Sequence, residues 1–228
     1  MIRLRSMRPT VAVLLAAVLI VAAGGAAVAS NMGFKFNKAL VLGPEAGFVG
    51  HNYTAFPYHN PYGTWGGMCT QTGLLSTGLT RTRLRAFNYN IEDDTFTTAN
   101  CGTAQAAAQT LVKGKGIEIM GLGATPTSII IVGSHDPGHP VTLNKFKNFW
   151  FSVPYHTTAV TSNDLCTQAG MTSTGLTRAT IARLNATAGT FQTAACGSTT
   201  GAFNLVLGES VVLRETVKTS TMFVPSHY

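Results

Sequence analysis

The apolar residues of this chain fall in short runs that turn residues interrupt, and no long stretch repeats them every 3.6 residues. Residues 149–153 are mainly aromatic and β-branched and stop at Pro154, which is typical of a strand ended by proline. Residues 31–42 alternate apolar and polar side chains before they become apolar. Because Thr and Val are also frequent, the pattern predicts a mostly β protein.

One short helix is predicted over residues 163–169, with Ser162 as its N-cap and Gly170 just beyond its end. The remaining strand-like runs of the second half are residues 176–184, 190–195, 203–206, 211–215 and 222–224. The first four runs predict two hairpins, which turn at residues 185–189 and at Gly208.

A long internal match shows that the pattern occurs twice. The segment CTQTGLLSTGLTR (69–81) recurs as CTQAGMTSTGLTR (166–178), with ten of thirteen positions identical at an offset of 97. Pro-Tyr-His at 57–59 recurs at 154–156 with the same offset. These matches indicate a tandem duplication. We therefore expect two homologous small β-sandwich or open-barrel modules, each with one short helix and one disulfide.

The matches also divide the chain. We assign residues 30–43 to a strand-like N-terminal arm, 44–136 to the first module, 137–143 to a linker and 144–228 to the second module. An Asn-Lys pair is shared by residues 36–40 and 141–146, which favours a leading strand for each module. In the alternative, the arm is loose and adds to the sheet edge of a neighbouring molecule, so that the protein self-associates.

The first 29 residues have the pattern of a secretory signal peptide. Arg3, Arg5 and Arg8 precede an apolar stretch that ends in Ala-Val-Ala, which predicts cleavage before Ser30. An uncleaved signal anchor is the alternative. We expect an extracytoplasmic protein, whether secreted, periplasmic or on the cell surface. Without residues 1–29 the net charge falls from +7 to +4, which does not argue for a nucleic-acid partner.

The four cysteines stand two to a module, at spacings that fit neither CxxC metal pairs nor a haem motif. Because each ancestral module could form such a bridge alone, the duplication favours Cys69–Cys101 and Cys166–Cys196 among the three possible pairings. Each bridge should contribute roughly 3–4 kcal/mol by constraining the unfolded chain.

Few residues suggest chemistry. The recurring Tyr and His of Pro-Tyr-His would suit a ligand contact or an acid–base pair, although a structural role is favoured because both copies keep them. Ser134-His135-Asp136 and His139 form the densest group of metal-ligand types, but their spacing matches no known metal motif. No cofactor and no metal are expected.

Two surface features are candidates for binding. Arg81, Arg83 and Arg85 alternate along a predicted strand and would line one face, either to contact an acidic glycan or as an ordinary charged strand face. Aromatic residues near each Pro-Tyr-His would either stack on sugar rings or form the core. The candidate ligand-contacting residues are Tyr58, His59, Trp65, Arg81, Arg83, Arg85, Tyr155 and His156.

The chain resembles repeat modules of exported bacterial surface proteins, in which a strand entering Ser-Leu-Pro-Tyr is followed by a Gly-Glu-Gly-Tyr turn. The corresponding segments are Phe-Ser-Val-Pro-Tyr at 151–155 and Leu-Val-Leu-Gly-Glu-Ser at 205–210, the latter departing from the pattern at Ser210-Val211. The resemblance implies an extracytoplasmic β module of surface or adhesive proteins and brings no catalytic residues.

These observations favour an exported, non-catalytic structural or assembly protein of the cell surface or extracellular space. A carbohydrate-binding protein, with a cell-wall or extracellular glycan as partner, is the alternative. A hydrolase or metal-dependent enzyme ranks third. No membrane span is expected after signal cleavage.

Overall fold

The computed structural model describes residues 33–41, 50–74, 83–87, 96–121, 128–134, 136, 138–171, 173–174, 177–186 and 188–226. Only the backbone is described for residues 34, 83–87, 173–174 and 177–178. The fold is mostly β with short helices and open sheets, as the sequence predicted. None of the described helices is long and apolar enough to cross a membrane. The predicted signal peptide lies outside the described residues.

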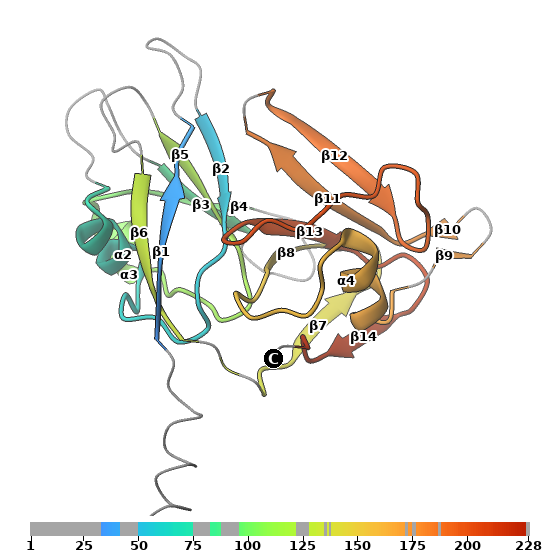
Figure 1. The fold of residues 1–228 in the computed structure, drawn as a ribbon. Coiled ribbons are helices and arrows are strands. Elements are labelled where there is room, and N and C mark those ends of the chain that lie inside the picture. The colour runs from blue at the N-terminus through green and yellow to red at the C-terminus, as the bar shows by residue number, and fades with distance from the viewer. Residues whose placement is uncertain are drawn as a thin grey trace, which may run out of the picture. The chain divides into compact units, whose positions relative to one another are not determined.

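The first half of the chain contains a four-stranded and a two-stranded sheet (Figure 1). Its strands are β1 (Phe34–Ala39), β2 (Gly50–Thr54), β3 (Arg83–Phe87), β4 (Phe96–Asn100), β5 (Ile117–Gly121) and β6 (Ser128–Gly133). The four-stranded sheet has the order β2-β5-β3-β4 with antiparallel neighbours, and β1 pairs with β6.

The second half has the same arrangement. Its strands are β7 (Val141–Asn144), β8 (Asn148–Ser152), β9 (Ser173–Thr174), β10 (Thr177–Arg178), β11 (Thr180–Asn185), β12 (Thr190–Ala195), β13 (Ser210–Arg214) and β14 (Ser220–Phe223). The four-stranded sheet has the order β8-β13-β11-β12, and β7 pairs with β14. Each strand thus has the neighbours that its counterpart has in the first half, while β9 and β10 form a separate small pair.

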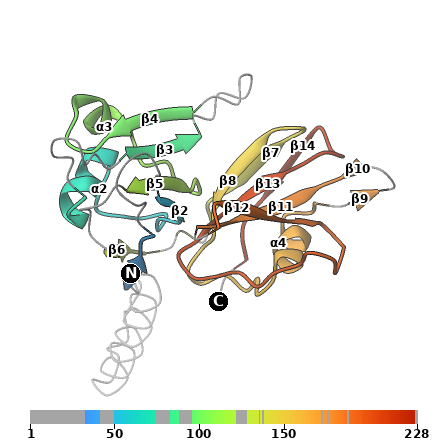
Figure 2. The same ribbon diagram turned by 90° about the horizontal axis from the view of Figure 1, so that it is seen from above.

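Each half has a short helix that begins at a threonine cap: α2 (Trp65–Thr72) and α4 (Ser162–Gln168). The hydroxyls of Thr64 and Thr161 accept backbone N–H groups of the first turn. The sequence predicted Ser162 as the N-cap of this helix, but the N-cap of α4 is Thr161, one residue earlier. The first half also contains α3 (Ala104–Ala108), which lies beside α2 (Figure 2).

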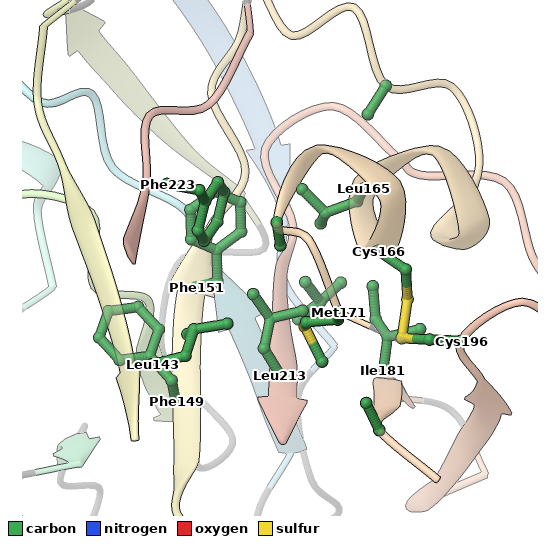
Figure 3. Close-up of a cluster of buried hydrophobic side chains, with 14 of the residues drawn as sticks. Leu143, Phe149, Phe151, Leu165, Cys166, Met171, Ile181, Cys196, Leu213 and Phe223 are labelled. Carbon is green, nitrogen blue, oxygen red and sulfur yellow. A yellow bond between two sulfur atoms is a disulfide. The ribbon is translucent and has the colours of Figure 1, made fainter. Parts of the chain in front are cut away.

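Among the described residues, each half has its own hydrophobic core. In the second half, Phe151 of β8 packs beside Phe223 of β14, and Leu165 of α4 covers the same cluster (Figure 3). The predicted bridges, Cys69–Cys101 and Cys166–Cys196, are both present. Each therefore joins a helix to the end of the outermost strand of its four-stranded sheet.

The second predicted hairpin does not form. Residues 203–206 are not a strand, because their backbone pairs with the residues just before α4 instead of with β13. Ser162 donates its N–H to the Phe203 carbonyl at 2.8 Å, and Leu205 donates to the Val160 carbonyl at 2.8 Å. β13 lies between β8 and β11 instead.

The N-terminal arm is bound within its own chain over the described residues. β1 hydrogen-bonds to β6, as β7 does to β14, so that each half has its own leading strand. The side chain of Asn52 also holds Val41, accepting its N–H at 2.7 Å and donating to its carbonyl at 2.9 Å. The loose-arm alternative therefore does not describe residues 34–41.

Candidate functional site

The residues from Lys35 to Tyr228 form one compact unit, inside which the two halves meet where β2 and β8 end. The Tyr58 hydroxyl donates to the Ser152 carbonyl at 3.3 Å. The Tyr155 hydroxyl donates to the Ala55 carbonyl at 3.0 Å. Tyr155 corresponds to Tyr58, and Ser152 corresponds to Ala55, each at the repeat offset of 97. Each half therefore gives the other the same hydrogen bond, and the contact is reciprocal. We call this contact the junction; it comprises residues 53–58, 114–116, 150–155 and 208–210.

Backbone hydrogen bonds repeat the same reciprocity. Ala55 donates its N–H to the Gly208 carbonyl at 3.1 Å, and Ser152 donates to the Gly114 carbonyl at 2.9 Å. An isolated antiparallel bridge lies beside each of these bonds. The junction is therefore built like the interface of a two-fold symmetric dimer, in which the same patch of each partner is used twice.

One side chain breaks the symmetry. The Ser152 hydroxyl accepts the Phe56 N–H at 2.9 Å and donates to the Phe56 carbonyl at 2.9 Å. The equivalent position in the first half is Ala55, which has no side-chain hydroxyl. The second half thus makes a buried side-chain contact at the junction that Ala55 cannot return.

Four aromatic rings from both halves form a row across the junction, which we call the aromatic strip. Tyr53 and Trp150 are equivalent residues, and their ring centroids are 4.2 Å apart. Phe96 packs on Trp150 at 5.8 Å, and its equivalent Phe191 packs on Tyr53 at 5.5 Å. Such separations are typical of aromatic pairs that stabilise an interface.

The ends of the aromatic strip are more exposed than its centre. Trp150 is 3% exposed, whereas Phe96 is 42% and Phe191 is 50% exposed. The two exposed rings lie against buried Trp150 and half-buried Tyr53, and an exposed aromatic face can stack on a flat apolar or sugar ring. Sequence analysis missed both phenylalanines, although each stands in a recurring Thr-Phe-x-Thr-Ala segment.

Three predicted ligand contacts are buried: Trp65 is 3%, Tyr58 5% and Tyr155 8% exposed. Burial raises the pKa of both tyrosines, and the nearby Asp136 carboxylate adds to the rise at Tyr58. Trp65 begins α2 and donates its N–H to Gln109. The recurring tyrosines hold the two halves together and offer a ligand little surface.

The predicted histidines are not gathered into one site. His59 is exposed, and its Nε2 lies 3.5 Å from Asp136 Oδ2, which also accepts a hydrogen bond from Lys113 at 2.9 Å. That bond from Lys113 lowers the pKa of Asp136. His156 is half-buried, and His135 lies outside the described residues. Within the described ranges no three His, Cys, Asp or Glu residues are placed to hold a metal ion.

The charged strand face of Arg81, Arg83 and Arg85 remains a prediction. Arg81 lies outside the described residues, and only the backbone of Arg83 and Arg85 is described. In the sheet, these two residues stand opposite Met120 and Glu118 of β5. Glu118 is itself buried and contacts the His51 ring of β2. Sequence patterns could not suggest that pair, because its members lie 67 residues apart on different strands.

Three charged residues in or beside the junction, Lys38, Lys115 and Glu209, are partly or fully buried. Burial lowers the pKa of Lys115 to about 8. Burial also raises the pKa of Glu209 and lowers the pKa of Lys38. The attraction between the two charges opposes both shifts.

Comparisons of the chain with family models, with curated proteins and with solved structures found no match.

Proposed function

We propose that the protein is an exported, non-catalytic structural protein of the cell surface or extracellular space, in which the two halves form one compact unit. One observation supports this most: the side chains that recur in both sequence copies maintain the fold. The cysteines form one bridge in each half, and the recurring tyrosines donate hydrogen bonds across the junction. Two disulfides are also typical of proteins that fold in an oxidising compartment.

Fractionation of the source cells tests this proposal. We expect the protein in the extracytoplasmic or cell-surface fraction, with a mass that begins at Ser30 and no alkylatable thiol before reduction. A cytoplasmic protein with four free thiols would contradict both the location and the structural role. A protein that retains residues 1–29 in the membrane fraction would instead support the anchored alternative.

Self-association through the arm would require exchange of β1 between two copies, because β1 already pairs with β6. The ring of Phe36 on β1 also packs edge-on against Tyr155 of the second half, at 5.5 Å. Exchange would break and remake both contacts. Size-exclusion chromatography of the mature chain over a hundredfold range of concentration tests this, and a monomer at every concentration argues against assembly through the arm.

Glycan binding is the second candidate, and the exposed ends of the aromatic strip favour it. Phe96 packs on Trp150 and Phe191 packs on Tyr53, and the rings of Tyr53 and Trp150 contact each other at a tilt. Removing both exposed rings, as Phe96→Ala and Phe191→Ala, should abolish retention on any glycan that the parent binds, while the fold is kept. A glycan array that includes acidic polysaccharides, with no retained member, would argue against this candidate.

A further inference from the structure

The junction contains one close steric match between positions that correspond in the two halves. Gly116 precedes β5, and Ser210, which lies 94 residues later, begins β13. A Cβ atom added at Gly116 would overlap the Cβ and Oγ atoms of Ser210. The backbone of Gly116 does not have the left-handed conformation that would itself require glycine. The space taken by Ser210 therefore excludes a side chain there.

Ser210 contributes to this contact through the space its side chain fills and not through a hydrogen bond. It is 1% exposed, and its Oγ has no hydrogen-bond partner among the described residues. A buried hydroxyl without a partner lowers stability, so hydrogen bonding does not account for a serine at this position. Its side chain instead fills the space that Gly116 leaves open.

The match works only between unlike halves. Two second halves placed in the same arrangement would bring Ser210 against Ser210, where a side chain has no room. Two first halves would bring Gly116 against Gly116, leaving a void, and would lose the hydrogen bonds of the Ser152 hydroxyl, because Ala55 stands at that position. Voids and overlaps both destabilise a packed interface.

We propose that the junction is a selective recognition surface that binds the unlike half of this chain, in the same molecule or in a second copy, and that Gly116 and Ser210 set this selectivity. The inference goes beyond the structural role proposed above and does not depend on it. Within one molecule the linker keeps the unlike halves together, so pairing with a second copy is seen only when the internal pairs of both molecules are weakened or blocked.

Four variants of the full mature chain test the selectivity. Gly116→Ser should lower the thermal unfolding midpoint by roughly 5 °C or more, because it places two serines face to face. Ser210→Gly should lower it by less, because it leaves only the void of one small side chain and removes a hydroxyl that has no partner. Combining both substitutions should restore the midpoint, because the serine and glycine have only exchanged sides. Gly138→Ser is the matched control and should have no effect, since a Cβ there meets nothing within 4 Å.

A mixture of the two single variants tests recognition between molecules. Gly116→Ser blocks its own junction and Ser210→Gly leaves a void in its own, whereas each half of one variant fits the unlike half of the other. Native mass spectrometry should therefore show a heterodimer in the equimolar mixture, which the different masses of the variants identify, and monomers of each variant alone. A mixture that stays monomeric would overturn recognition between copies.

The double variant keeps the selectivity itself testable if Gly116→Ser alone does not fold. Recovery of the parent midpoint in Gly116→Ser/Ser210→Gly supports the steric match. If the double variant is no more stable than Gly116→Ser, or if Gly116→Ser is as stable as the parent, the proposed role of these two residues is wrong.

Discussion

At the scale of single residues, the tyrosine of Pro-Tyr-His has a structural explanation. Its side chain crosses the junction and donates to a backbone carbonyl of the opposite half, once from Tyr58 and once from Tyr155. A buried carbonyl that loses its donor costs more than the bond contributes, because water cannot replace the donor. A tyrosine therefore stabilises the contact between the halves at this position in both copies of the sequence.

Replacing Tyr155 by Phe should lower the free energy of unfolding by about 1–2 kcal/mol, because the Ala55 carbonyl loses its buried donor while the ring is kept. Urea denaturation measures this loss. Tyr58→Phe, which removes the longer of the two equivalent bonds, should have the same sign and a smaller size. Stability unchanged in both variants would show that these bonds do not hold the junction.

A second residue-scale prediction concerns Glu215, which is fully buried. Its Oε1 accepts the backbone N–H groups of Thr216, Val217 and Lys218 at 2.9, 2.7 and 3.1 Å. Its Oε2 accepts the Thr221 hydroxyl at 3.3 Å. Because a carboxylate accepts such bonds more strongly than an amide, Glu215→Gln should cost roughly 2–3 kcal/mol.

The isosteric Glu215→Gln change keeps the volume of the side chain, so urea denaturation reports the loss of charge-assisted bonds and not a cavity. Thr221→Val, which removes only the Oε2 contact, is the matched control and should cost less. A glutamine variant as stable as the control would contradict this role of the carboxylate.

At the scale of elements, β1 connects the two halves. It hydrogen-bonds to β6 of its own half, while Phe36 packs on Tyr155 and closely covers Gly208 of the other half. Because Gly208 has a φ of 78° and no side chain, the ring can lie directly on the turn. The arm is thus part of the folded unit from Lys35 onward.

Phe36→Ala should therefore lower the free energy of unfolding by roughly 1–3 kcal/mol, less than for a fully buried phenylalanine because the ring is only half-buried. Urea denaturation of the mature chain measures the loss. Phe146→Ala is the control: its ring is 54% exposed, and truncating it should cost less. Equal losses in both variants would show that β1 does not stabilise the contact between the halves.

Elements with local signals could be predicted from the sequence, and those with distant partners could not. The hairpin β11–β12 has its turn residues between its strands, and the duplication alone favoured the correct cysteine pairing. Residues 203–206 look like a strand but pair with residues some forty positions earlier. The aromatic strip likewise needs residues 96 and 191 on one surface, which only the junction provides.

At the scale of the whole molecule, stability should depend on pH through Lys115 at the junction. Its pKa is about 8 when folded, below its ordinary value of 10.5, because burial disfavours the charged amine. Between these pH values the unfolded chain binds more protons than the folded one, so stability should rise as pH increases through this window. Below pH 8 the penalty for burying the charge is present in full.

Lys115→Met should therefore be more stable than the parent at pH 7, and its stability should not rise between pH 8 and 9.5. Urea midpoints at half-unit pH steps measure both effects. Buried Tyr58 and Tyr155 have raised pKa values, so they destabilise the fold only above about pH 10, outside this range. Parallel pH curves for parent and variant would contradict the role of Lys115.

The junction also has a consequence for the order of folding. Its side-chain hydrogen bonds join residues 94, 96 and 100 positions apart, whereas each core and each disulfide closes within one half. Contacts so distant in sequence form slowly, because a long loop must close before they stabilise anything. As the chain is synthesised, the first half can complete its core before the second half exists. Its side of the junction then stays exposed until the second half has been synthesised and folded.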